Sequence, residues 1–118
     1  MTVLDTNVLI YFSEGRFAEP LAVTGYFISV ITEIEALGHK GLSAPNEANL
    51  RTIIEQMTVL SVDETVKEEA IRLRRTTNLR LPDAIVAATA IVTGSELLTH
   101  DEDLLRAPGL KASAPPLK

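Results

Sequence analysis

Five carboxylates are the residues of this sequence best suited to chemistry, because each follows a predicted strand or opens a predicted helix: Asp5, Glu35, Asp83, Asp101 and Asp103. Asp5 stands between two apolar segments, where an uncompensated carboxylate costs several kcal/mol. Crowded carboxylates repel one another unless a cation neutralises them, and hard divalent cations prefer oxygen ligands. The pattern is therefore compatible with an acidic metal site.

Short apolar runs that alternate with helical patterns should position these acids. Buried strands are predicted at residues 1–4, 26–30, 58–62 and 97–99, with a last short strand in the C-terminal tail. Amphipathic helices are predicted at residues 45–57 and after residue 62, and an almost wholly apolar, interior helix at residues 82–94. This alternation predicts one α/β domain over residues 1–118 with a mainly parallel central sheet. In such sheets ligands bind at the carboxyl ends of the strands, so the acids are expected to converge there.

The helix after residue 62 carries two finer predictions. Ser61 and Glu64 fit a capping box at its start. Glu68 is spaced to pair with Arg72, while Val66, Ala70 and Leu73 form the buried face.

Each acid also has an ordinary structural explanation. Glu35 fits a capping box with Thr32, and Asp83 lies in the first helical turn, where the helix dipole favours a carboxylate. Asp101 and Asp103 fit a solvated turn before a short helix, and Asp5 fits the N-cap of a helix from residue 7. Convergence of the acids on one site is what separates the functional interpretation from these explanations.

Composition excludes several other classes of protein. The chain has no cysteine, so it cannot form disulfides or use a cysteine nucleophile. A net charge of −5 argues against a broadly basic nucleic-acid-binding surface. There is no signal-peptide pattern and no apolar run long enough to span a membrane, so a soluble cytoplasmic protein is expected. Phosphate-binding loops and serine-hydrolase elbows are absent, and His39 and His100 are too isolated to predict a ligand pair.

Four stretches taken in order resemble the acidic motifs of the PIN domain, in particular of VapC-like toxins from VapBC toxin–antitoxin pairs. They are "VLDTNVLIYF", "SVITEIEAL", "LRLPDAIVAATAI" and "LLTHDEDLL". Asp5, Glu35 and Asp83 match the first three motif acids, and Thr99, Asp101 and Asp103 match the fourth motif. The resemblance implies a three-layer α/β/α sandwich and a Mg²⁺- or Mn²⁺-dependent ribonuclease.

The resemblance also implies roles for individual residues and a set of partners. Asp5 and Asp83 would bind metal directly, Glu35 and Asp101 directly or through water, and Asp103 is a further candidate ligand. Thr6, Asn7 and Thr99 would orient the ligands. Independently of the resemblance, Arg74, Arg75 and Arg80 come just before Asp83 and suit contacts with RNA phosphates, although a solvated helix face explains these arginines equally well. The partners implied are an RNA substrate, a VapB-like antitoxin and a second copy in a homodimer.

Two other functions stay open on the sequence alone. A haloacid-dehalogenase-like phosphatase would use Asp5 as its nucleophile, but it would need an aspartate at position 7, which is Asn7. A non-catalytic PIN-like binding module would be favoured by the loss of a motif acid, and none is missing.

Overall fold

A computed structural model of the protein describes residues 1–22 and 24–118. Its elements in chain order are β1 Thr2–Leu4, α1 Thr6–Ser13, β2 Tyr26–Ser29, α2 Val30–Leu37, α3 Ala44–Glu55, β3 Thr58–Leu60, α4 Glu64–Thr76, α5 Leu81–Val92, β4 Glu96–Leu98, α6 Glu102–Leu105 and β5 Ala112–Ser113. The strands and helices expected from the sequence are all present, most with ends shifted by one or two residues.

The strands form one sheet in the order β3-β2-β1-β4-β5, and every pairing is parallel. The prediction of a mainly parallel α/β sheet is therefore confirmed. The chain starts at the central strand, builds outward through β2 and β3, and then returns to the other side of β1 to add β4 and β5. This change of direction lies between β1 and β4, and it marks the position where such folds bind their ligands.

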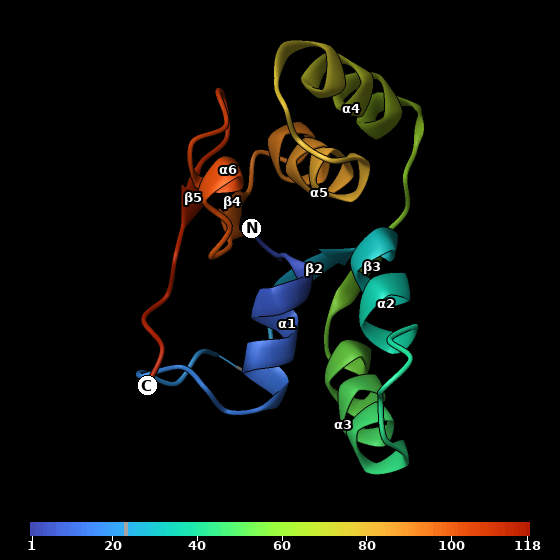
Figure 1. The fold of residues 1–118 in the computed structure, drawn as a ribbon, viewed down its shortest axis with the longest axis vertical. Coiled ribbons are helices and arrows are strands. Elements are labelled where there is room, and N and C mark those ends of the chain that lie inside the picture. Colours follow the sequence, from blue (N-terminus) through green and yellow to red (C-terminus); the bar gives the residue numbers. More distant parts are fainter. Residues whose placement is uncertain (23) are drawn as a thin grey trace.

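Helices cover both faces of the sheet, as Figure 1 shows. Successive strand residues point to opposite faces, so Val3 packs into the core beneath α4 and α5, whereas Leu4 packs into the core beneath α1, α2 and α3. Leu97 and Leu98 divide between the two cores in the same way. The arrangement is the predicted three-layer α/β/α sandwich.

The interior character predicted for α5 is confirmed along most of its length. Ala84, Ala87, Ala88 and Ala90 have no exposed surface, and such small side chains let neighbouring backbones approach closely. Its most exposed apolar side chains are at the two ends, with Leu81 57% exposed at the start and Val92 36% exposed at the end. Within residues 1–22 and 24–118, no helix combines the length and hydropathy that a membrane span requires.

Two predictions about α4 are wrong. Its N-cap is Asp63, whose carboxylate accepts the Val66 N–H at 2.8 Å, so Ser61 and Glu64 form no capping box. Arg72 donates to both carboxylate oxygens of Glu69 at 2.7 Å instead of pairing with Glu68. The i,i+3 spacing allows both guanidinium donors to be used at once, which an i,i+4 rule does not anticipate.

Candidate active site

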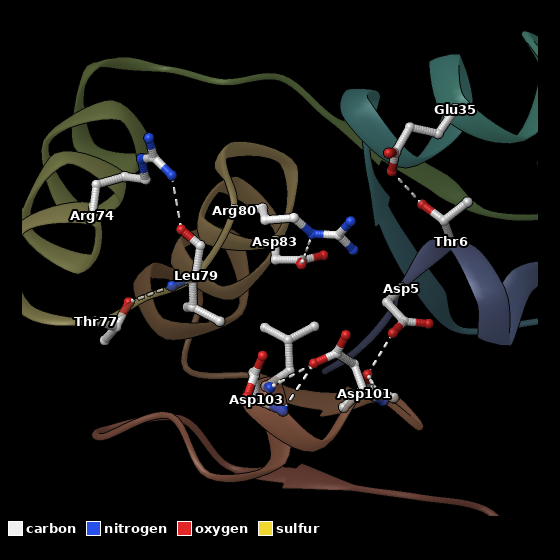
Figure 2. Close-up of polar contacts among 12 residues, drawn as sticks. Asp5, Thr6, Glu35, Arg74, Thr77, Leu79, Arg80, Asp83, Asp101 and Asp103 are labelled. Atoms are coloured by element: carbon white, nitrogen blue, oxygen red, sulfur yellow. Dashed lines mark hydrogen bonds and ion pairs between the residues drawn. The ribbon is translucent and has the colours of Figure 1, made fainter.

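Four of the five predicted acids line one pocket of about 210 Å³. Asp5 comes from the end of β1, Glu35 from α2, Asp83 from the start of α5 and Asp101 from the segment after β4. Figure 2 shows their side chains around a common space. The remaining lining residues are Thr6, Asn7, Arg80 and Val86. The pocket lies where the strand order reverses, so the topology brings together acids that are far apart in the sequence.

Asp5 is a structural residue as well as a member of the pocket. It is the N-cap of α1, and its Oδ1 accepts the Val8 N–H at 2.8 Å, so the N-cap interpretation is confirmed. Its Oδ2 accepts a hydrogen bond from the Thr99 hydroxyl, which ties β1 to the end of β4. Asp5 is only 7% exposed, and this burial raises the pKa of its carboxyl, opposed by the two hydrogen bonds and reinforced by Asp83 and Asp101.

Glu35 is held from the first turn of α1. Its Oε1 accepts the Thr6 hydroxyl hydrogen at 2.7 Å, across 29 positions of sequence. The capping explanation for Glu35 is wrong, because α2 begins at Val30 and Ser29 caps it by accepting the Ile31 N–H at 3.1 Å. Thr32 therefore lies inside the helix, and no structural cap accounts for Glu35.

Asp83 faces the pocket from the first turn of α5. Its Oδ2 lies 3.6 Å from Nε of Arg80, whose side chain is 83% exposed, so solvent screens this ion pair. Burial raises the pKa of the Asp83 carboxyl, and the charges of Asp101 and Glu35 raise it further, while Arg80 lowers it. A carboxylate with two acidic neighbours and one solvent-exposed arginine beside it would gain from a further positive charge.

Asp101 and Asp103 have different surroundings although they are two positions apart. Asp101 lines the pocket and caps α6, because its Oδ1 accepts the N–H groups of Asp103 at 2.9 Å and Leu104 at 3.1 Å. Asp103 lies outside the pocket, where its Oδ1 is 3.4 Å from the guanidinium of Arg106. The structure therefore brings Asp101 to the other acids and leaves Asp103 beside them.

The three predicted RNA-binding arginines are divided between two places. Only Arg80 lines the acidic pocket. Arg74 donates to the Leu79 carbonyl at 2.9 Å, as Figure 2 shows, and lies with Arg75 along a groove between α4 and α5. Val86 lines the acidic pocket and was not predicted, although its position one turn after Asp83 puts it on the same face of α5.

The donor set of the pocket fits a hard divalent cation. All four acids offer carboxylate oxygens, and burial raises the pKa values of the Asp5 and Asp83 carboxyls, so a bound cation would favour their ionised forms. Among residues 1–22 and 24–118, no three acidic, histidine or cysteine side chains lie close enough together to coordinate a metal ion in their present positions. Thr6 donates to Oε1 of Glu35 and Arg80 lies 3.6 Å from Oδ2 of Asp83, so each carboxylate keeps a second oxygen that a cation can use.

The sequence matches the PIN domain profile over residues 2–110, which is nearly the whole chain. The chain belongs to the PIN domain family. A comparison with curated protein sequences gives no match.

Solved structures agree with this PIN assignment. A toxin–antitoxin complex from Klebsiella pneumoniae contains a chain 30% identical to this PIN domain, with 98% of each chain covered and a TM-score of 0.78. VapBC from Salmonella typhimurium, bound to DNA, is 22% identical with 96% of each chain covered and a TM-score of 0.77. VapBC2 from Rickettsia felis, bound to a promoter fragment, is 15% identical with 97% and 98% covered and a TM-score of 0.76. The last two likenesses establish a fold shared with VapBC proteins.

The raised pKa of Asp83 gives this PIN domain a predicted pH dependence of stability. Because the folded-state pKa lies above the unfolded value near 3.8, ionised Asp83 opposes folding at neutral pH, and this penalty disappears as the pH falls through the folded pKa. Asp83→Asn carries no such penalty. Its free energy of unfolding relative to wild type should therefore be most favourable near pH 7 and decline toward pH 4. Urea unfolding at several pH values, with chelator present, measures this difference; a difference that grows on acidification contradicts the prediction.

Proposed function

We propose that this PIN domain is a Mg²⁺- or Mn²⁺-dependent endoribonuclease that acts as the toxin of a type II toxin–antitoxin pair. The observation that carries the proposal is the meeting of Asp5, Glu35, Asp83 and Asp101 in one pocket at the reversal of strand order. Each acid comes from a different part of the chain. Helix capping does not explain Glu35 or Asp83, because neither residue is the N-cap of its helix. Four carboxylates in one small cleft favour phosphodiester hydrolysis assisted by a divalent cation.

The proposed roles follow from the environment of each side chain. Asp5 and Asp83 would hold the cation directly, because burial raises the pKa of both carboxyls and a cation beside them would favour their ionised forms. Glu35 and Asp101 would hold it directly or through water. When bound, the cation would make water a stronger nucleophile and stabilise negative charge on the phosphate.

The hydroxyl groups and the arginine have supporting roles in this proposal. Thr99 holds Asp5 and Thr6 holds Glu35, so both acids stay oriented toward the pocket before the cation arrives. Arg80 is exposed at the rim and can leave Asp83 to contact an RNA phosphate.

The partners proposed are an RNA substrate, a VapB-like antitoxin and a second copy of the chain. The likeness to a toxin–antitoxin complex at 30% identity supports the antitoxin. The acidic pocket supports it independently, because a basic segment of a partner would be attracted to the same charges that attract a cation. Such a segment would compete with metal and RNA, which is a direct way to silence the enzyme.

Cleavage of single-stranded RNA tests the proposed function. The purified protein should cleave RNA in Mg²⁺ or Mn²⁺, lose this activity in chelator, and recover it when metal is restored. Metal should also raise the melting temperature, because it binds the folded state preferentially. Cleavage that persists in chelator, or a melting curve that millimolar Mg²⁺ and Mn²⁺ both leave unchanged, would show that the pocket does not work as proposed.

A further inference from the structure

Arg80 occupies a position at the start of α5 for which helix chemistry gives no reason. It is the N-cap of the helix, yet its side chain makes no capping hydrogen bond. Serine, threonine, aspartate and asparagine are preferred at this position, because their short side chains accept the free N–H groups of the first turn. A cation there is also opposed by the positive end of the helix dipole. The start of the helix therefore does not explain an arginine at position 80.

The guanidinium of Arg80 is directed to the acidic pocket instead. Its Nε lies 3.6 Å from Oδ2 of Asp83, and Figure 2 shows the group beside that carboxylate, toward the space between the acids. Of the described residues that line the pocket, Arg80 alone is cationic. Burial and the charge of Asp101 raise the pKa of the Asp83 carboxyl, and the charge of Arg80 lowers it. Arg80 is therefore a partial counter-ion for this pocket.

The contact between Arg80 and Asp83 is weak enough to be exchanged. The Arg80 side chain is 83% exposed, and ion pairs in such positions contribute little to stability. The second oxygen of Asp83 stays available to a metal ion, so Arg80 opposes the metal by its charge and does not block it. A guanidinium displaced from a carboxylate at the rim of the pocket is well suited to bind a phosphate.

We propose that Arg80 is an exchangeable counter-ion that couples metal binding to RNA binding. With no metal bound, Arg80 pairs with Asp83. When a divalent cation is bound, Arg80 turns outward and binds a phosphate of the RNA. This inference rests on the proposed function and adds a coupling between its two ligands. Because such a coupling is reciprocal, RNA that draws Arg80 away should also increase the affinity of the pocket for metal.

A second ion pair of the same kind provides a matched control. Arg106 and Asp103 have the same i,i+3 spacing as Arg80 and Asp83, and their charged groups are 3.4 Å apart. Both members of this pair are exposed, and neither lines the acidic pocket. Arg106→Gln therefore removes the same charge as Arg80→Gln from an equivalent pair while leaving the acidic pocket unchanged.

Calorimetric titration with Mn²⁺, in the absence of RNA, measures the first half of the exchange. Arg80→Gln should bind Mn²⁺ about two- to fivefold more tightly than wild type, because one opposing charge has been removed from an exposed position. Arg80→Lys keeps the charge and should bind Mn²⁺ as wild type does, and so should Arg106→Gln. Circular dichroism confirms that each variant is folded.

The salt dependence of RNA binding measures the second half. Fluorescence anisotropy of a labelled single-stranded RNA would be recorded over a range of salt concentrations, either with Ca²⁺ or with chelator. Ca²⁺ also takes oxygen ligands, and gel electrophoresis checks that the RNA stays intact. With Ca²⁺, the slope of log K against log salt should be about 0.7 shallower for Arg80→Gln than for wild type, as expected for one lost phosphate contact. In chelator the two slopes should agree, because Arg80 then pairs with Asp83.

The outcomes separate this inference from the proposed function. A wild type that binds neither Mn²⁺ nor Ca²⁺, or that does not bind RNA, overturns the proposed function and this inference with it. If wild type binds both ligands but Arg80→Gln binds Mn²⁺ no more tightly than Arg106→Gln, the inference alone is wrong. The same holds if the salt slopes of wild type and Arg80→Gln differ as much in chelator as in Ca²⁺, because Arg80 would then contact RNA whether or not metal is bound.

Discussion

Asp83→Asn should reduce RNA cleavage by about three orders of magnitude while leaving the fold intact. The change removes one charge from the proposed cation site but keeps the size of the side chain. Loss of a metal contact of several kcal/mol corresponds to about 10³-fold in rate, at tenfold for each 1.36 kcal/mol. Asp83 makes one screened ion pair with exposed Arg80, so little structure depends on it. Single-turnover cleavage of a labelled RNA in saturating Mg²⁺ measures the effect.

Asp103→Asn is the matched control for this prediction. Like Asp83→Asn, it removes one negative charge, and it does so only two residues from Asp101. Asp103 itself lies outside the pocket, beside Arg106. Its cleavage rate should stay within about threefold of wild type, as expected for a surface charge that does not contact the reacting groups. If Asp103→Asn is as inactive as Asp83→Asn, the proposed ligand set is incomplete. If Asp83→Asn cleaves at the wild-type rate, the pocket is not the active site.

Asp5→Ala should cause the largest loss of stability among the pocket variants, about 2–4 kcal/mol in the free energy of unfolding. The substitution removes the cap of α1 and leaves both the Val8 N–H and the Thr99 hydroxyl without their partner in a buried place. Relief of the buried charge offsets only part of this loss. A fall in melting temperature of about 10 °C is expected for a domain of this size.

Asp5→Asn separates the two roles of this residue. Its amide oxygen can still accept the Val8 N–H, and its NH₂ group can donate to the Thr99 oxygen, so the melting temperature should stay near that of wild type. Cleavage should be lost nevertheless, because the charge that faces the cation is gone. Equal melting temperatures for Asp5→Ala and wild type would show that Asp5 does not stabilise the fold.

The periodicity of apolar residues is enough to predict most of this fold, because each strand and helix buries a distinct face. Alternation of strands and helices predicts the parallel sheet, and the wholly apolar stretch of α5 predicts its interior position. Helix starts are harder to predict, because several polar residues near one another can serve as the cap. Asp63 caps α4 although Ser61 and Glu64 fit the familiar motif. Ser29, not Thr32, caps α2 for the same reason.

The sequence predicts which acids come together in the candidate site, because the ends of the strands determine where the backbones of these residues lie. Asp5 and Asp101 follow strands, Asp83 lies in the first turn of α5, and Glu35 lies in the helix that directly follows β2. Parallel topology carries all four to one edge of the sheet. Side-chain direction is not determined in this way. Asp103 is two residues from Asp101, yet the turn into α6 directs it to Arg106. The same limit applies to the arginines. Arg74 and Arg75 are close to Arg80 in the sequence, but they line a different surface.

The central position of β1 has a consequence for how the protein is made. The strand β1 pairs with β2 on one side and with β4 on the other, and the Asp5–Thr99 hydrogen bond spans 94 positions of sequence. Contacts between such distant segments form late and slow the folding of a chain. A nascent chain that ends before β4 therefore contains Asp5, Glu35 and Asp83 but has no complete acidic pocket. If the protein is the proposed nuclease, a nascent chain could not cleave RNA until β4 and Asp101 have been synthesised and the pocket has closed.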